Sequence, residues 1–429
     1  MKSYVTRQVR SVKGEITVPG DKSISHRAIM LGSLAQGTTT VRGLLRGEDN
    51  VSTINAFRAM GAEIIDEGEV VTIRGKGLHG LQEPADVIDC GNSGTSMRLI
   101  SGILAGQKFF SVLTGDQYLR KRPMKRVLDP LGRMGAEIHA RAEGTLAPLA
   151  IVGKKLNGIS YQSPISSAQV KSAILLAGLY ASGETSVVEP HLSRDHSERM
   201  LRYFGADIEV SPDCIRIRGE RELDGREVVV PGDISSAAFF MVAALLVPGS
   251  ELLIRNVGIN PTRTGIIDIL TSMGGSLQMV DRREISGEPV ADILVRSSRL
   301  KGIEISGDLV PRSIDEFPVI CVAAAFAGGK TVIRDARELR VKETDRIAAM
   351  AVNLDKAGAM VKETPDGMEI KGGEQLRGCV VNSFGDHRIA MSMLVAGLTA
   401  KDGVTVEDVD CISTSFPNFI DLMEKVTVK

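Results

Sequence analysis

The sequence lacks the features that mark several classes of protein. Its 429 residues include no tryptophan, and only 4% are aromatic, which argues against a surface that stacks nucleic-acid bases. Lys and Arg number 52 against 53 Asp and Glu, so the net charge of −1 gives no overall attraction to nucleic acid or to an anionic membrane. The remaining composition is typical of globular proteins, and the length allows two or three domains.

Cysteine, histidine and long apolar runs are also scarce. The five cysteines are scattered and never form CxxC, which favours reduced thiols in the core of a cytosolic protein over a disulfide framework. The six histidines form no HExxH pattern, so no metal site is expected. The first 15 residues contain no apolar stretch typical of a secretory signal. The longest apolar run, 237–247, is shorter than the roughly 20 residues of a membrane span, so we expect a buried helix there and a cytoplasmic protein.

Self-comparison shows that the chain repeats one pattern. A polar opening of small residues precedes an apolar helix, a β-branched strand, an amphipathic helix that ends at glycine, and further strands. The opening PGDKSISHRAIML resembles a later segment, PGDISSAAFFMVA. A period of this length, about 72 residues, predicts several two-helix units rather than a short-repeat solenoid. The openings begin at Pro19, Gly91, Ser166, Pro231, Asp315 and Gly385, and the closing glycines are Gly61, Gly135, Gly205, Gly274 and Gly358.

The two most similar copies divide the chain into halves of three units each. Residues 1–19 precede the first copy, and we expect them to add a strand to the second half. The sequence therefore predicts one domain of 1–19 plus 232–429, which contains both termini, and an inserted domain of 20–231. The chain would cross between them twice, and two crossover strands of this kind predict a hinge.

Polar and basic residues gather at the expected N-termini of the buried helices, where free N–H groups favour an anion. Residues 120–126, RKRPMKR, are basic at five of seven positions, and a solvated turn is the plain alternative. Residues 340–346, RVKETDR, place Lys342 and Arg346 four apart, a repulsive spacing of about 0.2–0.5 kcal/mol on a helix. The recurrence of such groups in a neutral chain predicts sites for anionic ligands.

Seven motifs together resemble those of the 5-enolpyruvylshikimate-3-phosphate synthases, in order and over essentially the whole chain. The resemblance implies an α/β (α+β) fold of two similar domains, each with three βαβαββ-type units around buried parallel helices. It also implies an enzyme of the shikimate pathway of aromatic amino acid biosynthesis. The motifs are PGDKSISHR (19–27), GNSGTSMR (91–98), KRPMKR (121–126), SSAQVKSA (166–173), DEFP (315–318), RVKETDR (340–346) and GDHR (385–388).

The implied reaction transfers the enolpyruvyl group of phosphoenolpyruvate to the 5-hydroxyl of shikimate 3-phosphate and releases phosphate. The resemblance implies no cofactor, no metal, no nucleic acid or membrane partner, and a monomer. The residues implied for shikimate 3-phosphate are Lys22, Ser23, Arg27, Ser167, Ala168, Gln169, Arg194, Asp315 and Lys342. Those implied for phosphoenolpyruvate are Lys22, Asn92, Gly94, Arg122, Gln169, Arg346 and Arg388.

Three of these groups are implied to move protons. Asp315 would be the base near the 5-hydroxyl, and Glu343 would exchange the proton at the methylene carbon. Lys22 would assist proton transfer at the bridging and leaving oxygens. Since addition protonates this carbon and elimination deprotonates it, one carboxyl must serve as acid and then as base.

The sequence departs from some family members at the site. Thr414 stands where a lysine often precedes the Phe-Pro step, and a frequent tyrosine of the shikimate pocket is absent, with Arg194 supplied instead. These features indicate a second subfamily. Gly94 occupies the position that is alanine in some inhibitor-tolerant members, which predicts sensitivity to glyphosate.

Two other functions fit parts of the pattern. An enolpyruvyl transferase acting on UDP-N-acetylglucosamine would have asparagine after the first lysine and a cysteine in the 116–122 loop, where this chain has Ser23 and no cysteine. A non-catalytic repeat protein that binds phosphorylated metabolites would not need Asp315 and Glu343 beside the basic groups.

Overall fold

The computed structural model describes residues 2–373 and 375–429. They form two compact units, each with a hydrophobic core of its own. We call residues 1–19, 231–284 and 289–429 the terminal unit, because it contains both chain ends, and residues 20–230 with 285–288 the inserted unit. Both mix helices with sheets, so the chain has an α/β fold.

The inserted unit contains three four-stranded sheets of identical connectivity. In each, the first strand is parallel to the second, the second is antiparallel to the third, and the fourth is antiparallel to the third. The first sheet has β18 (Glu227–Val229), β4 (Thr38–Arg42), β6 (Val70–Arg74) and β5 (Glu63–Asp66); the second has β7 (Ile88–Asp89), β8 (Phe110–Thr114), β10 (Leu146–Val152) and β9 (Glu137–Ala140); the third has β12 (Ser160–Gln162), β14 (Glu184–Val188), β16 (Ile215–Arg218) and β15 (Asp207–Val210).

Three of the inserted unit's helices are almost wholly buried, and α3 packs against α6. Two short parallel pairs complete its strands: β11 (Leu156–Asn157) with β13 (Ala181–Ser182), and β17 (Leu223–Asp224) with β3 (Ala35–Gln36). The buried helices are α1 (Lys22–Leu34), α3 (Gly94–Ala105) and α6 (Ala168–Gly178); the others are α2 (Glu48–Ala59), α4 (Lys125–Arg133), the short α5 (Arg141–Gly144), α7 (His196–Tyr203) and the 3-10 turn η1 (Leu119–Lys121).

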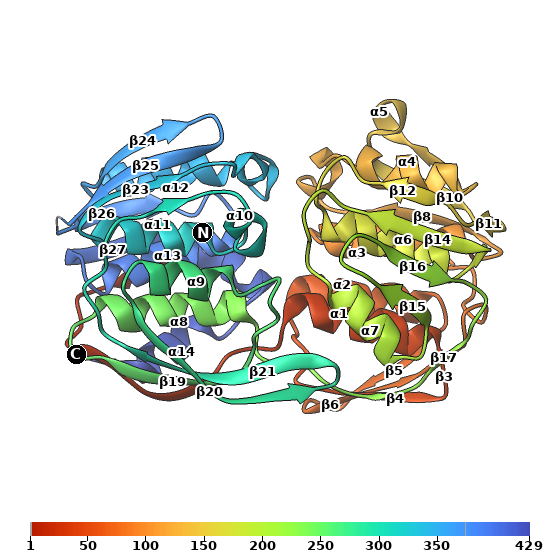
Figure 1. Cartoon of the computed structure of the whole chain (residues 1–429), viewed down its shortest axis with the longest axis horizontal. Helices are drawn as coiled ribbons and strands as arrows, with labels where there is room; N and C mark the ends of the chain where they lie inside the picture. The colour runs from red at the N-terminus through yellow and green to blue at the C-terminus, as the bar shows by residue number, and fades with distance from the viewer. Residues whose placement is uncertain (1, 374) are drawn as a thin grey trace. The chain divides into compact units, whose positions relative to one another are not determined.

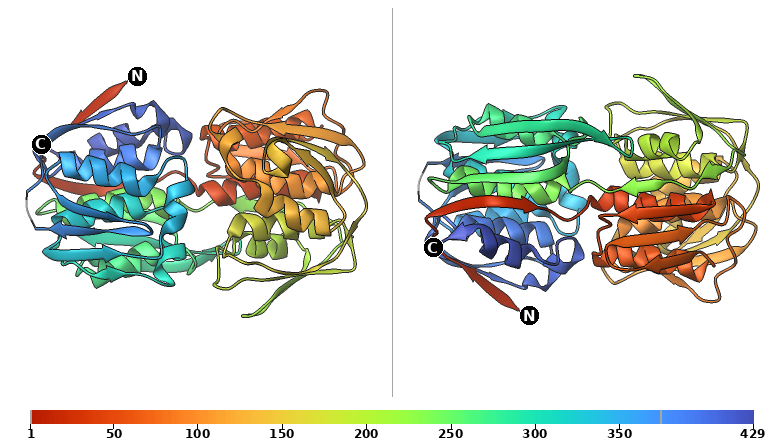
Figure 2. Two further views of the ribbon diagram at one scale, coloured as in Figure 1. Left: turned by 90° about the horizontal axis from the view of Figure 1, so that it is seen from above. Right: turned by 90° about the horizontal axis from the view of Figure 1, so that it is seen from below.

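The terminal unit repeats this connectivity with variations. Its four-stranded sheet follows the order β22, β23, β25, β24 with the same directions, and β1 lies beside β27 near the N-terminus (Figure 2). The three sheets are β22 (Glu304–Ile305), β23 (Gly329–Ile333), β25 (Gly367–Gly372) and β24 (Met360–Thr364); β1 (Ser3–Thr6), β27 (Lys401–Glu407) and β26 (Arg377–Asn382); and β20 (Ser276–Ile285), β21 (Glu288–Arg296), β19 (Glu251–Gly258), β2 (Ser11–Thr17) and β28 (Thr427–Val428).

Helices α8, α11 and α13 pack against one another within the terminal unit, with strands around them (Figure 1). The predicted buried helix at 237–247 lies in α8, which ends at Leu246 and is apolar and buried from Ala237 to Leu245. The helices are α8 (Ile234–Leu246), α9 (Gly265–Ser272), α10 (Leu309–Arg312), α11 (Phe317–Phe326), α12 (Arg346–Lys356), α13 (His387–Gly397), α14 (Phe419–Val426), and the 3-10 turns η2 (Arg337–Val341) and η3 (Val409–Thr414).

The closing glycines have one backbone conformation in common. Gly61, Gly135, Gly205, Gly274 and Gly358 have φ between 83° and 98°, where a side chain is strained. Each follows the last turn of an amphipathic helix, so glycine ends that helix in the left-handed conformation.

The hairpin of β20 and β21 was not anticipated from the sequence pattern. Its strands belong to the terminal unit, yet its tip, Ile285–Glu288, is grouped with the inserted unit. The chain therefore changes unit at two points beyond Pro19–Gly20 and Val230–Pro231.

All five cysteines are unpaired, as expected, but only Cys90 and Cys321 are core residues; the other three are partly exposed. Within the described ranges, no helix is long and apolar enough to cross a membrane.

Candidate active site

The start of α1 places Lys22 in an internal ion pair. Asp21 caps the helix by accepting a hydrogen bond from the Ile24 N–H at 2.9 Å. The Lys22 ammonium pairs with the Asp49 carboxylate, and Asn50 Nδ2 donates to the Lys22 carbonyl at 3.2 Å. Asp49 was missed in the sequence analysis, because only the packing of α1 against α2 brings it to the lysine.

Arg27, one turn further along α1, is buried and held by uncharged groups. Its Nε donates to Ser197 Oγ at 2.7 Å, Nη2 to Ser172 Oγ at 2.9 Å and Nη1 to the Ser23 carbonyl at 2.9 Å. Burial is the main cause that lowers the pKa of Arg27 to about 10; the charges of Glu198, Asp21 and Glu288 oppose it and the charge of Arg194 adds to it, so Arg27 stays protonated at neutral pH. Arg27 and Arg194, both predicted to bind shikimate 3-phosphate, are therefore close enough for the charge of one to affect the other.

The starts of α3 and α6 are linked by a chain of amide and guanidinium groups. Arg98 Nη1 donates to Gln169 Oε1 at 2.7 Å, and Gln169 Nε2 donates to Thr95 Oγ1 at 3.0 Å. A Cβ built on Gly94 would lie 2.8 Å from Arg98 Nη1 and 3.3 Å from Arg122 Nη1. Glycine at 94 thus leaves room for two guanidinium groups beside this helix N-terminus.

Arg122 lies in the predicted basic stretch and is also held by an amide. Its Nη2 donates to Asn92 Oδ1 at 2.5 Å, while Asn92 Nδ2 donates to Asp116 Oδ2 at 2.6 Å. α4 begins at Lys125, two residues after Pro123, and Arg122 precedes the helix in extended conformation.

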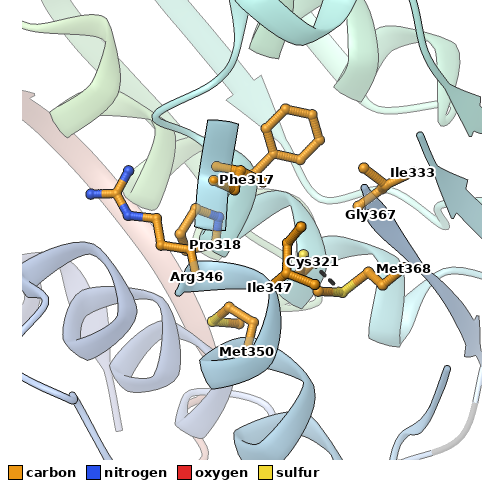
Figure 3. A pocket seen from close by; sticks show the side chains of 10 residues that line it. Phe317, Pro318, Cys321, Ile333, Arg346, Ile347, Met350, Gly367 and Met368 are labelled. Atoms are coloured by element: carbon orange, nitrogen blue, oxygen red, sulfur yellow. Dashed lines mark hydrogen bonds between the residues drawn. The ribbon is translucent and has the colours of Figure 1, made fainter. Parts of the chain in front are cut away.

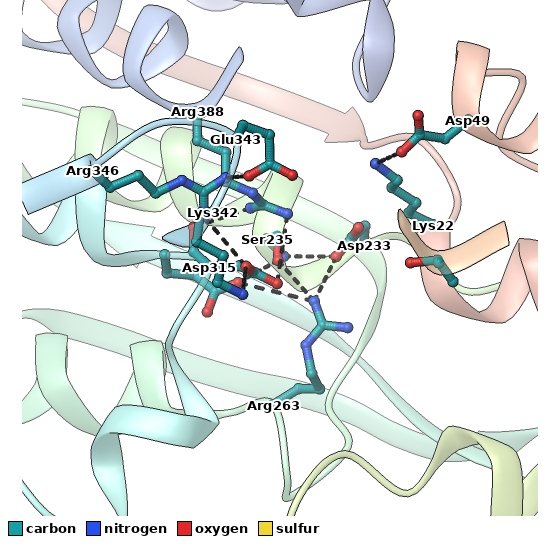
Figure 4. A network of polar contacts seen from close by, with 12 residues as sticks. Lys22, Asp49, Asp233, Ser235, Arg263, Asp315, Lys342, Glu343, Arg346 and Arg388 are labelled. Carbon is teal, nitrogen blue, oxygen red and sulfur yellow. Dashed lines mark hydrogen bonds and ion pairs between the residues drawn. The ribbon is translucent and has the colours of Figure 1, made fainter. Parts of the chain in front are cut away.

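In the terminal unit, three cations surround the Asp315 carboxylate (Figure 4). Lys342 Nζ and Arg346 Nη1 each lie 3.4 Å from Asp315 Oδ1, and Arg388 Nη2 lies 4.0 Å from Oδ2. Arg388 also donates to the Asp315 carbonyl at 3.2 Å. Asp315 lies next to Glu316, the N-cap of α11, so this helix start fixes its position.

Arg346, the first residue of α12, is 2% exposed and joins Asp315 to two further carboxylates. Its Nε donates to Asp386 Oδ2 and its Nη2 to Glu343 Oε2, both at 2.7 Å. Burial alone would lower the pKa of Arg346, but the charges of Asp386, Glu343 and Asp315 raise it above its ordinary value. The guanidinium is therefore a permanent positive charge that orients both predicted proton-transfer carboxylates.

The helical spacing expected for Lys342 and Arg346 is wrong. The 3-10 turn η2 ends at Val341, Lys342 is extended, and α12 begins only at Arg346. Because the backbone bends between them, both cations reach the same carboxylate instead of repelling each other along a helix face.

An apolar pocket lies on the other side of the Arg346 stem, and the guanidinium points away from it (Figure 3). Cys321 and Met368 line it with sulfur atoms 3.6 Å apart, and burial raises the pKa of the Cys321 thiol to about 12. The pocket is lined mainly by apolar side chains, which pack beside the charged cluster.

The structure divides the predicted residues between the two units, and we call the group in each unit a cluster. Among residues 2–373 and 375–429, no group of His, Cys, Asp and Glu could hold a metal ion. The inserted unit contains Lys22, Ser23, Arg27, Asn92, Gly94, Arg122, Ser167, Ala168, Gln169 and Arg194, and the terminal unit contains Asp315, Lys342, Glu343, Arg346 and Arg388.

Comparison with known proteins gives one consistent result. A sequence model of the family described as EPSP synthase (3-phosphoshikimate 1-carboxyvinyltransferase) matches residues 6–423. The 3-phosphoshikimate 1-carboxyvinyltransferases of Geotalea uraniireducens and Geotalea daltonii are 73% and 72% identical to this chain over 428 residues, covering 100% of both chains in each pair. A solved structure of EPSP synthase from Acinetobacter baumannii superposes with a TM-score of 0.90 at 48% identity, covering 100% of this chain and 98% of that one.

These matches extend over all seven motifs and both clusters. The family match and the full-length relatives agree with the chemistry of the described residues, in which cations and carboxylates lie together. The chain belongs to the EPSP synthase family, the 3-phosphoshikimate 1-carboxyvinyltransferases, and is a transferase of the shikimate pathway.

Proposed function

We propose that the two clusters divide the reaction between anion binding and proton transfer. The reaction joins the 5-hydroxyl oxygen of shikimate 3-phosphate to C2 of phosphoenolpyruvate while a proton adds to C3. The C2–phosphate bond then breaks and C3 loses a proton, which restores the double bond and releases phosphate. One observation carries this proposal. The Asp315 carboxylate lies among the cations of Lys342, Arg346 and Arg388, and the Glu343 carboxylate pairs with Arg346.

The inserted unit supplies cations and dipoles for the substrate anions. We assign Ser23, Arg27, Ser167, Ala168, Gln169 and Arg194 to shikimate 3-phosphate, and Asn92, Gly94, Arg122 and Gln169 to phosphoenolpyruvate. Arg guanidinium groups match phosphate and carboxylate oxygens in pairs, and the helix N-terminus at Ser167 adds backbone N–H donors. Lys22, held by Asp49, is a compact proton donor for the bridging and leaving oxygens.

The terminal unit supplies the acid–base groups. Asp315 takes the proton of the 5-hydroxyl, and Lys342 beside it binds shikimate 3-phosphate. Glu343 protonates C3 and later removes a proton from it, while Arg346 and Arg388 hold the phosphoenolpyruvate anion. The 2.7 Å contact between Arg346 and Glu343 aims this carboxylate without removing its capacity to exchange a proton.

We further propose that the two units are the family's two domains and that each contains three copies of one βαβαββ-type unit. The shared sheet connectivity and the glycines with φ between 83° and 98° support this interpretation. We also propose a cytoplasmic monomer that works without a cofactor. Light scattering tests the monomer, which has a mass of 45.9 kDa.

A coupled assay of phosphate release tests the activity. Phosphate should appear only when phosphoenolpyruvate and shikimate 3-phosphate are both present. Tight binding of both compounds without turnover would instead support a non-catalytic binding protein. Turnover with UDP-N-acetylglucosamine in place of shikimate 3-phosphate would support the other enolpyruvyl transferase.

A further inference from the structure

A buried cluster of charges lies behind the start of α6. Lys171, in the second turn of this helix, pairs with Glu189 at 2.9 Å and with Glu198 at 2.7 Å. The three side chains are 1%, 4% and 2% exposed. Burying charges is unfavourable unless they are paired and hydrogen-bonded, so the arrangement of their remaining contacts indicates what the cluster does.

The Glu189 carboxylate is bonded to two separate loops. Its Oε1 accepts the backbone N–H of Ser167 at 3.0 Å, and its Oε2 accepts the backbone N–H of Ser193 at 3.3 Å. The Ser193 hydroxyl lies 2.8 Å from both oxygens. Lys171 Nζ completes the cluster by donating to the Ser193 carbonyl at 3.3 Å.

The outer ends of the same two loops are also joined. Ser166 Oγ donates to the His191 carbonyl at 2.7 Å and accepts the His191 N–H at 3.0 Å. The segment before α6 and the segment before α7 are therefore fixed to each other at both ends. Glu189 joins the two segments through its carboxylate, which accepts from Ser167 in one segment and from Ser193 in the other.

These loops present residues that we assign to shikimate 3-phosphate. Ser167 is the N-cap of α6, and Ala168 and Gln169 form its first turn. Arg194 follows Ser193 directly, so the backbone bonds of Ser193 fix the point from which the arginine projects. The distance between the helix N-terminus and Arg194 thus depends on Glu189.

We propose that Glu189 is a positioning residue, neutralised by Lys171, that holds the α6 N-terminus and Arg194 in register for shikimate 3-phosphate. The inference rests on the proposed function. In this proposal, Glu189 contacts neither substrate directly and acts through Ser167 and Arg194. Its loss should therefore weaken one substrate selectively.

The test is Glu189→Gln, which keeps the shape of the side chain. It replaces one carboxylate oxygen with an NH2 group, which cannot accept hydrogen bonds from the backbone N–H groups or from Lys171. We expect the KM for shikimate 3-phosphate to rise at least tenfold, while the KM for phosphoenolpyruvate changes less than twofold. The matched control is Glu184→Gln at the start of β14, the strand that ends just before Glu189; the Glu184 carboxylate is exposed and pairs with Arg216 and Arg218. The control should leave both KM values unchanged.

A double-variant cycle separates positioning from general destabilisation. Because Glu189 acts through Arg194 as well as Ser167, adding Glu189→Gln to Arg194→Ala should raise the KM for shikimate 3-phosphate by a smaller factor than the same change does in the wild-type protein. Additive effects, or equal increases of both KM values, would overturn the proposal.

A milder variant covers the case in which Glu189→Gln does not fold. Ser193→Ala removes only the hydroxyl that both carboxylate oxygens contact and should raise the KM for shikimate 3-phosphate about threefold to tenfold. An unchanged KM in this variant would overturn the proposal. If the wild-type protein itself showed no turnover, the proposed function would fail; wild-type turnover with unaltered variants would contradict only the positioning role.

Discussion

The two clusters hold their arginines with opposite kinds of partner. In the inserted unit, Arg27 donates to two serine hydroxyls and a carbonyl, and Arg122 donates to an amide oxygen. In the terminal unit, Arg346 contacts three carboxylates. Neutral partners orient a guanidinium without cancelling its charge, whereas carboxylate partners neutralise it and are themselves held in place.

This difference explains the division of labour that we propose. Arginines that keep their positive charge attract phosphate and carboxylate groups. Arginines surrounded by carboxylates, such as Arg346, also fix the proposed acid–base groups Asp315 and Glu343, in addition to the phosphoenolpyruvate anion that we assign to Arg346 and Arg388. A near-neutral chain can therefore contain both an anion-binding region and a proton-transfer region.

Replacing one arginine from each cluster should give the largest contrast. Arg346→Gln leaves the buried Asp386 without its ion pair, so we expect a loss of about 3–5 kcal/mol in the free energy of unfolding and almost complete loss of activity. Arg122→Gln removes a partly exposed charge held by an amide, so stability should change by less than about 1 kcal/mol while the KM for phosphoenolpyruvate rises. Urea denaturation and steady-state kinetics measure both. Equal destabilisation by the two variants would contradict the comparison.

Gly94→Ala tests how tightly the inserted unit's arginines are arranged. The added methyl would meet Arg98 Nη1 at 2.8 Å, and Arg98 also holds Gln169. We expect the guanidinium groups to shift and the KM for phosphoenolpyruvate to rise about tenfold, equivalent to about 1.4 kcal/mol. Inhibition by glyphosate should weaken in parallel. Wild-type kinetics in this variant would show that the space beside Gly94 is not used.

A smaller effect is expected from the neutral network behind the inserted unit's cluster. His26 Nδ1 lies 2.7 Å from Thr53 Oγ1, and Thr53 contacts Ser96 at 2.6 Å. Burial, together with the charges of Lys22 and Arg27, lowers the pKa of His26 well below its ordinary value, while Asp21 acts weakly in the opposite direction. His26 is therefore neutral in the folded protein but protonates in the unfolded chain as the pH falls below about 6.5.

The stability that neutral His26 contributes is thus present above about pH 6.5 and is lost as the pH falls. Between pH 7 and 5.5, wild-type protein should lose about 1 kcal/mol more than the His26→Gln variant in the free energy of unfolding. Denaturation curves of both proteins at each pH give this difference. Identical pH dependence would contradict a neutral, buried His26.

The sequence predicted those features of the structure that depend on residues adjacent in the chain. The glycine at 274 and its counterparts predicted helix ends, and the run at 237–247 predicted a buried helix, because each depends on neighbouring residues alone. Asp49 and Glu189 could not be found in this way, since each reaches its partner only through packing of separate elements. The spacing of Lys342 and Arg346 misled because periodicity does not reveal the break before α12.

Deuterium exchange at the methylene of phosphoenolpyruvate tests the central claim most directly. With both substrates in D2O, wild-type protein should introduce deuterium into the methylene of the recovered phosphoenolpyruvate and of the product, as measured by mass spectrometry. Glu343→Gln keeps an oxygen for Arg346 but cannot exchange a proton, so it should bind both substrates, while turnover and deuterium incorporation should both be at least roughly a hundredfold slower. Deuterium incorporation at the wild-type rate in Glu343→Gln would contradict the assignment of proton transfer to this carboxylate.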